Sequence, residues 1–211
     1  MSFRFLRVQA FVIASTLSIA MLLFAAQRRD DKQVPQFRSV VDLSASALDS
    51  TSPGTVLISP AKVGGAWTVD SLPALRLVAP LAIIQAERKN FPDSELLLTM
   101  DDIASYERLH GAVSQGSIVL ATTGQEGKAP VFNDDALHFL IEARNVVGVG
   151  GAGTQVVSPE QNSYLGKKGI YQLENVANVS LIPRSGAIAI AAPQKIPGAS
   201  ESPVRLMALV K

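Results

Sequence analysis

Short apolar runs separated by polar turns recur along residues 39–211 and predict alternating strands and helices. Runs rich in β-branched residues and bounded by polar, glycine or proline positions are typical of strands. Because the run at 77–84 is apolar throughout and interrupted only by Pro80, we expect that strand to be buried on both faces. The pattern predicts strands at 39–43, 55–58, 77–84, 117–121, 146–149, 170–173, 186–192 and 204–210.

Two segments between these runs show helix signals. Thr99 followed by Asp102 is a capping-box pattern, which predicts a helix at 100–109. Asn133 is a favoured N-cap residue, and apolar residues then repeat at helical spacing, which predicts a helix at 134–144. The mixture of elements predicts an α/β or α+β fold with a substantial sheet.

The N-terminus has a different pattern. Arg4 and Arg7 precede an uncharged run, Val8–Ala26, and nineteen residues of helix span about 28 Å, close to the thickness of a bilayer core. Residues 1–27 are interpreted as a cleaved signal peptide or an uncleaved signal anchor, with a soluble helix as a third alternative. Either main interpretation predicts a domain that is exported or membrane-anchored, outside the cytoplasm. The polar residues 28–38 are expected to be a linker.

The amino-acid composition excludes several kinds of functional site. The chain has no cysteine, which excludes disulfides, thiolate metal sites and cysteine nucleophiles. Its two histidines, His110 and His138, make a histidine-rich metal site improbable, and we expect both to be structural or surface residues. The net charge of +1 comes without a basic stripe, so no nucleic-acid partner is predicted.

The run Gly148–Gly153 formally matches the dinucleotide pattern GxGxxG. A true fingerprint opens a helix within a βαβ unit, whereas residues 154–159 look like strand and turn. A dinucleotide site also needs an acidic residue further along the chain, and Glu174 lies at about the right distance from the glycines. However, we predict no βαβ unit that would carry Glu174. The run is therefore interpreted as a tight loop and not as a nucleotide site.

Several stretches together, in order, resemble the metal-dependent cyclase family, whose members are kynurenine formamidase- or isatin hydrolase-like. No single stretch is specific, but the set covers the chain from about Ser39 to its end. The matching stretches are residues 41–44, 65–73, 98–103, 116–124, 135–140, 147–149, 173–178 and 196–205.

The resemblance implies a swivelling β/β/α domain over residues 39–211 and a homo-oligomer. It also implies hydrolysis of an amide or lactam bond with zinc or manganese, as in the hydrolysis of N-formylkynurenine during tryptophan catabolism. The family motif is His-x-Gly-Thr-His-x-Asp-x-x-x-His. Its imidazoles and carboxylate converge on a metal that lowers the pKa of a bound water.

In this chain the matching segment is residues 52–62, which keeps Gly54 and Thr55 but not the ligands. A further family histidine falls at Asn162, and the family glutamate is retained as Glu174. Aliphatic side chains offer a metal no lone pair, and a lysine ammonium repels cations. We therefore expect no metal cofactor. The positions of the lost family residues are Ser52, Val56, Ile58, Lys62 and Asn162.

Lys62 and Glu174 both match positions that face the metal in relatives. A buried carboxylate without a cation is costly, so one hypothesis pairs the Lys62 ammonium with Glu174. The alternative is an exposed Lys62, with Glu174 hydrogen-bonded to the backbone.

Three functions remain open. The first is a non-catalytic binding or scaffold domain, in which Trp67 and the vacated pocket accept a small aromatic ligand. The second is a hydrolase that uses a hydroxyl nucleophile with Lys62 as base, with Glu174 as a further catalytic candidate. The third is an arylformamidase-type amide hydrolase whose metal is held by residues that cannot be identified from the sequence. The candidate hydroxyls are Ser52, Thr55 and Ser59.

Overall fold

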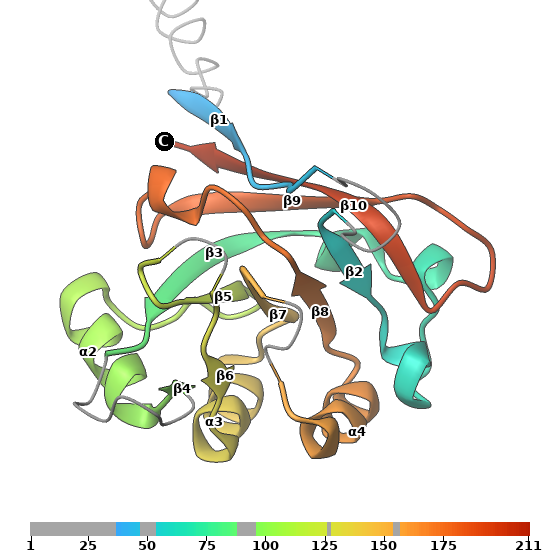
Figure 1. Ribbon diagram of the computed structural model, residues 1–211, viewed down its shortest axis with the longest axis horizontal. Coiled ribbons are helices and arrows are strands. Elements are labelled where there is room, and N and C mark those ends of the chain that lie inside the picture. Colours follow the sequence, from blue (N-terminus) through green and yellow to red (C-terminus); the bar gives the residue numbers. More distant parts are fainter. Residues whose placement is uncertain (1–36, 47–53, 88–95, 126–127, 154–156) are drawn as a thin grey trace, which may run out of the picture. The chain divides into compact units, whose positions relative to one another are not determined.

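The computed structural model describes residues 37–46, 54–87, 96–125, 128–153 and 157–211, which belong to one compact unit, Phe37–Lys211. In these residues seven strands close into a barrel in the order β10-β2-β8-β7-β5-β3-β9, because β9 pairs back onto β10, and β1 adds to the outside of β10 (Figure 1). The strands are β1 (Ser39–Asp42), β2 (Val56–Ile58), β3 (Val78–Gln85), β5 (Ile118–Thr122), β7 (Gly148–Gly151), β8 (Tyr171–Glu174), β9 (Ala187–Pro193) and β10 (Glu201–Val210).

Three helices lie on one side of the barrel, away from β1, β9 and β10 (Figure 1). They are α2 (Met100–His110), α3 (Asp134–Arg144) and α4 (Pro159–Lys168). The short strands β4 (Leu97–Leu98) and β6 (Val131–Phe132) form a separate parallel pair. The capping box that Thr99 and Asp102 predict is present at the start of α2. Asn133 caps α3 by accepting a hydrogen bond from the Asp135 amide.

Two apolar cores follow from the alternation of side chains along the strands. In β3, Leu81 and Ile83 point into the barrel, where they join Leu206 and other barrel residues. Ala82 and Ile84 point the opposite way and pack beneath the helices. As predicted, β3 is therefore buried on both faces over this stretch. The parallel run of β3, β5, β7 and β8 carries the helices, which is typical of α/β architecture.

The glycine run differs from its prediction. Residues 148–151 form strand β7 itself and not a tight loop. A Cβ atom on Gly148 would lie 2.4 Å from the ring of Tyr171, and one on Gly150 would lie 2.5 Å from the Leu173 carbonyl oxygen. The glycines therefore allow β7 to approach β8 closely, which gives them a packing role.

Helix α4 was not predicted, and β7, α4 and the parallel strand β8 form the βαβ unit whose absence we had expected. The signals for α4 are in the sequence. Ser158 and Gln161 form a capping box, Pro159 occupies the first turn, and Gly169 ends the helix in a left-handed conformation. Because apolar residues are sparse in α4, it lacks the periodicity that reveals the other helices.

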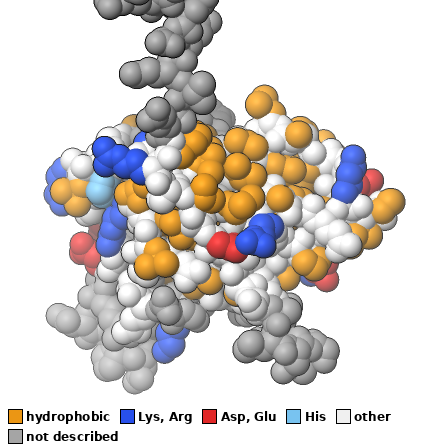
Figure 2. Space-filling view, turned by 90° about the horizontal axis from the view of Figure 1, so that it is seen from above, with side chains coloured by type: hydrophobic (Ala, Val, Ile, Leu, Met, Phe, Trp, Pro, Cys, Tyr) orange, Lys and Arg blue, Asp and Glu red, His pale blue; other side chains and the backbone are white. Residues whose placement is uncertain are grey.

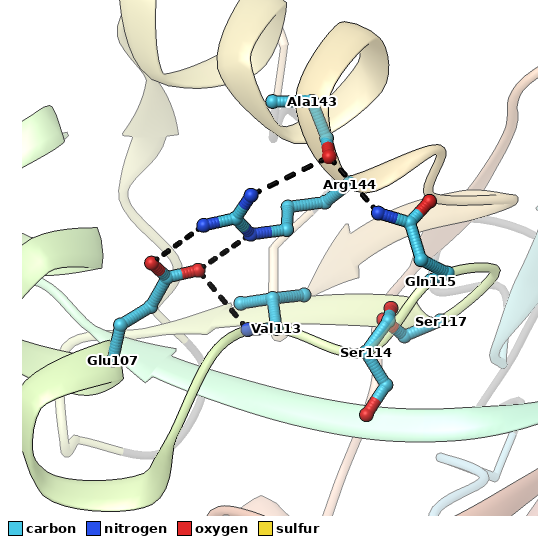
Figure 3. Close-up of polar contacts among 7 residues, drawn as sticks. All are labelled: Glu107, Val113, Ser114, Gln115, Ser117, Ala143 and Arg144. Atoms are coloured by element: carbon cyan, nitrogen blue, oxygen red, sulfur yellow. Dashed lines mark hydrogen bonds and ion pairs between the residues drawn. The ribbon is translucent and has the colours of Figure 1, made fainter.

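A polar network joins the ends of α2 and α3 (Figure 3). The Arg144 Nε and Nη2 atoms donate to the two carboxylate oxygens of Glu107 at 2.7 and 2.8 Å. Glu107 Oε1 also accepts the Val113 amide at 3.0 Å, and the Gln115 side chain donates to the Ala143 carbonyl. Arg144 lowers the pKa of Glu107, with its hydrogen bond as the largest cause. The network fixes the turn that leads into β5.

The described fold is thus mixed α/β with a closed seven-stranded barrel, in agreement with the predicted class. Across the described ranges, none of the helices has the length and apolar character required to span a bilayer. The run Val8–Ala26, the proposed signal segment, most of the linker at 28–38 and the candidate Ser52 lie outside those ranges.

Candidate functional site

Strand β2 carries two of the family's ligand positions and lies between β8 and β10. Leu57 is buried in the barrel core. Its neighbours Val56 and Ile58 face the other way, because side chains alternate along a strand. In the antiparallel pairing with β8, Val56 lies opposite Glu174, and Ile58 lies opposite Gln172. Two positions that the motif resemblance assigns to metal ligands, Val56 and Glu174, are therefore neighbours in the sheet.

The other flank of β2 is formed by the start of β10. Ile58 lies opposite Glu201, and Val56 lies opposite Pro203. Residues paired in this way share one face of a sheet. We call this surface the outer β2 face. It consists of Val56, Ile58, Gln172, Glu174, Glu201 and Pro203.

Lys62 lies in the 3-10 helix η1 (Pro60–Val63), which follows β2 directly. Its ammonium forms an ion pair with Glu201, and both side chains are about half exposed, at 44% and 53%. Among the described residues, no ion pair joins Lys62 to Glu174, and Lys62 is exposed, as the second of the two alternatives predicts. Its partner Glu201 was not identified because the strand predicted there began at residue 204, which left Glu201 out of the sheet.

Glu174 is half-buried at the end of β8. Burial raises the pKa of its carboxyl group, the positive charge of Lys62 lowers it, and the negative charge of Glu201 raises it. The net direction is upward. Glu174 is thus a carboxyl group that holds its proton more readily than usual, a property useful in a general acid or base.

Asn162 lies on α4 and comes close to the same face. Its Oδ1 atom accepts a hydrogen bond of 2.8 Å from the Gln172 side chain. Helix α4 packs tightly against the segment after η1, because a Cβ atom on Gly65 would lie 2.5 Å from the Gly166 carbonyl oxygen. These two glycines allow α4 to hold Asn162 against β8.

The described candidate hydroxyls have structural partners. Thr55 is 2% exposed. Its hydroxyl accepts the Ala45 amide and donates to the Asn175 carbonyl, both at 2.7 Å. Ser59 is equally buried and donates to the Ser200 carbonyl at 2.9 Å. Both hydroxyl protons are thus held by backbone carbonyls and not by Lys62.

Trp67 packs against the barrel core and is separate from the outer β2 face. The Arg76 guanidinium lies 4.9 Å from the centroid of the Trp67 ring. Gly169 is close to the ring edge, where a Cβ atom would come within 2.8 Å. Arg76 also donates to the Gly169 carbonyl at 2.9 Å. One face of the indole is therefore occupied by the protein itself.

The two histidines lie on helices away from the outer β2 face. His110 ends α2 and its ring lies 5.0 Å from that of Tyr106. His138 lies on α3 with its ring 4.3 Å from that of Tyr164. Both residues are exposed, in agreement with the prediction that they are structural or surface residues.

The donor set of the outer β2 face does not suit zinc or manganese. Val56 and Ile58 are aliphatic, and Lys62 adds a positive charge. Two carboxylates remain, one of which is already paired with Lys62. Within the described ranges, no group of three or more histidine, cysteine, aspartate or glutamate side chains is placed to hold a metal ion. Zinc and manganese are bound by imidazole, thiolate or carboxylate groups, and on the outer β2 face only Glu174 and Glu201 carry such a group.

A groove of about 490 Å³ opens beside the outer β2 face. Its walls are mainly apolar and include Val56 and Pro203. Arg205 also lines it and forms an ion pair of 2.8 Å with Asp42. The groove combines apolar surface with a cation, a combination that suits a small apolar molecule with an acidic group.

Sequence reasoning missed Gln172, Glu201 and Arg205 as members of this region. Gln172 is 5% exposed and occupies an alternating position in an otherwise apolar strand, which is a signal for a polar contact. Glu201 and Arg205 share the outward-facing alternation of β10. That alternation was not recognised because Pro203 interrupts the pattern at the start of the strand.

The closed barrel, the helices on one side and the outer β2 face define a mixed α/β domain of the type found in solved isatin hydrolases. The family model described as "Putative cyclase" matches residues 18–156. The chain therefore belongs to the cyclase family.

Individual relatives agree with this assignment. An isatin hydrolase from Roseibium aggregatum is 30% identical over 167 residues, which cover 67% of this chain and 63% of that protein. This chain thus spans less than two thirds of that relative's length. The solved isatin hydrolase A from Labrenzia aggregata, bound to benzyl benzoate, is 26% identical with a TM-score of 0.66, over 85% of this chain and 86% of that one. An isatin hydrolase bound to the product analogue thioisatinate is 26% identical with a TM-score of 0.65, over 84% of each chain.

Proposed function

We propose that this domain binds a small aromatic acid or amide in the groove beside the outer β2 face, without metal-dependent hydrolysis. The observation that carries the proposal is the position of Val56. It lines the groove and lies opposite Glu174, at a position that the motif resemblance assigns to a metal ligand. An aliphatic side chain there supports a binding site without a metal. The relatives support the ligand class, because one binds benzyl benzoate and another binds thioisatinate.

Arg205 supplies the polar recognition in this proposal. Its side chain is 66% exposed and can form a charge-assisted hydrogen bond with the acidic group of a ligand. The apolar wall of Val56 and Pro203 then accepts the ring. Replacing Arg205 by glutamine removes that charge and should weaken binding about tenfold, as one such bond is worth roughly 1.5 kcal/mol.

A second candidate function is metal-free hydrolysis of an amide bond, which the similarity to isatin hydrolases favours. The specific observation is the raised pKa of Glu174. Its carboxylate would take a proton from water as the oxygen adds to the amide carbonyl. The same proton would pass to the nitrogen as the C–N bond breaks. Lys62, with its ammonium nearby, would stabilise the negative charge that develops on the carbonyl oxygen.

One set of measurements separates the two functions. The purified chain is analysed for zinc and manganese by mass spectrometry, titrated with thioisatinate, and assayed for hydrolysis of isatin and N-formylkynurenine with and without added metal. Thioisatinate binding that weakens in Arg205→Gln, but not in the control Arg108→Gln on α2, supports the binding function. Metal-free turnover that is lost in Glu174→Gln supports the hydrolase. Stoichiometric metal with turnover would refute both.

A further inference from the structure

The face of the sheet opposite the helices carries an apolar surface, which is interrupted on one side by the ion pair of Asp42, opposite Met207, with Arg205. Val40 on β1 lies opposite Leu209 on β10, which lies opposite Ile188 on β9. One pair further along, Met207 lies opposite Ile190, which lies opposite Val78 on β3. We call this surface the sheet patch. It consists of Val40, Val78, Ile188, Ile190, Met207 and Leu209.

The sheet patch faces outward. The residues that alternate with it, Ala189, Leu206 and Ala208, are 0% exposed and belong to the barrel core. Val40 and Val78 are 59% and 51% exposed. Figure 2 shows hydrophobic side chains gathered on this face, and in Figure 1 the three helices lie on the other side. Contiguous apolar surfaces of this kind mark sites that contact a partner or a membrane.

The residues that precede the domain favour a membrane, and not a protein partner, as the surface that the sheet patch contacts. The apolar run Val8–Ala26 is followed by only twelve residues, 27–38, before β1 begins at Ser39. Even when fully extended, twelve residues reach at most about 40 Å. If the run is an uncleaved anchor, β1 can never be far from a bilayer, and Val40 of the sheet patch is the second residue of β1. A tether this short gives the bilayer a high effective concentration.

Charges near the sheet patch suit a lipid surface. Arg38 directly precedes β1, and Lys211 directly follows β10, so both flank the β1–β10 pair that carries Val40 and Leu209. Both are exposed. Basic side chains beside an apolar surface are attracted to anionic headgroups. The apolar side chains and the basic side chains therefore favour the same orientation of the domain on a bilayer.

We propose that the sheet patch rests on the surface of the bilayer in which residues 8–26 anchor the chain. The contact is peripheral, with the apolar side chains at the headgroup boundary and the helices directed away from the lipid. Arg205 of the groove lies on the same outward face of β10 as Met207, so the groove opens beside the proposed lipid contact. The two proposals are tested separately, because the vesicle measurement below uses no groove ligand.

The absence of cysteine from the chain allows a direct test. The full-length chain carrying Met207→Cys or Ile190→Cys is labelled with an environment-sensitive fluorophore and reconstituted into vesicles. The vesicles contain phosphatidylcholine, phosphatidylglycerol and a lipid that bears a quencher. The matched control is Ser163→Cys, on the exposed side of α4.

Quenching several-fold stronger at both sheet-patch positions than at Ser163→Cys is the expected result, with a decrease when phosphatidylglycerol is omitted. Equal quenching at all three positions would overturn the proposal. So would lipid-independent energy transfer between labels on two copies, because a second copy would then cover the sheet patch. Recovery of a cleaved chain lacking residues 1–27 in solution would also overturn it.

Discussion

Val56 lies directly opposite Glu174 in the antiparallel pairing of β2 with β8. A half-buried carboxyl group thus lies beside an aliphatic side chain on the outer β2 face. Both residues match positions that the motif resemblance assigns to metal ligands. A small number of substitutions on β2 and η1 can therefore test whether this surface is able to bind a metal ion.

Restoring the family residues should restore metal affinity. The variant Val56→His with Ile58→Asp and Lys62→His adds two ligands on the face of β2 that is shared with Glu174 and one on η1. We expect it to bind one zinc ion in titration calorimetry, whereas the parent chain does not bind zinc stoichiometrically. Adding Glu174→Gln to the variant should weaken zinc binding at least about tenfold, as for other supporting groups of a metal site. Equal zinc binding by the parent chain would show that other residues hold the metal.

Glu174→Gln should stabilise the domain slightly at neutral pH. Because the pKa of Glu174 is raised in the folded state, with burial as the largest cause, its ionisation opposes folding. This cost is present above the folded pKa and disappears as the pH falls toward the unfolded pKa of about 4.3. The expected gain is no more than about 0.5 kcal/mol, since the group is half-exposed. Urea unfolding of both proteins across this pH range measures it, with the exposed Glu87→Gln as control. A gain that grows at low pH would contradict the assigned cause.

Glu107→Gln should destabilise the domain by about 1–2 kcal/mol at neutral pH. The substitution removes a two-bond contact with Arg144, whose side chain is only 22% exposed. The pKa of Glu107 is lowered in the folded state, so this stability is present above the unfolded pKa and is lost as the pH falls through the folded pKa. Thermal unfolding against pH measures the loss. Arg144→Lys alone should also lower the stability, because a lysine ammonium cannot form both hydrogen bonds with the Glu107 carboxylate.

The exposed ion pair between Lys168 and Glu142 provides the comparison for that measurement. Its side chains are 41% and 56% exposed, so Lys168→Gln should change stability far less than Glu107→Gln does. A loss as large as that of Glu107→Gln would show that burial does not decide the strength of these pairs.

Gly150→Ala should be strongly destabilising, by about 3 kcal/mol or more. The new methyl group would lie 2.5 Å from the Leu173 carbonyl oxygen, and backbone cannot move aside as a flexible side chain can. Gly116→Ala is the matched control, because nothing lies within 4 Å of its Cβ position although its φ is +73°. Its cost should remain near 1 kcal/mol. Chemical unfolding of both variants tests the difference, and equal losses would refute the close-packing explanation.

The sequence predicted the strongly patterned elements well. Helix α3 begins and ends at the predicted residues, because Asn133 supplies a cap and apolar residues follow at regular spacing. The boundaries of β2 and β3 lie within one residue of the prediction. In these segments local propensity and burial indicate the same structure.

The failures occurred where packing between elements decides the structure. Gly150 weakens a strand by its own propensity and is explained only by the approach of β8. Helix α4 depends on its caps and on contact with Gly65, which no periodicity reveals. At the site, the sequence identified Lys62 and Glu174 as neighbours of the family's metal position. It could not identify Glu201 as the partner of Lys62, because that contact depends on the register of β10 against β2.

Strand β10 is the last of the chain, yet it pairs with β1, β2 and β9. During synthesis β1 therefore has no strand partner among the described residues until β10 has left the ribosome. Contacts between such distant parts of a chain form slowly. Until then the unfinished barrel exposes unpaired strand edges, which are prone to aggregation. Chaperones that hold nascent chains are consequently expected to determine how much of this protein reaches its native state.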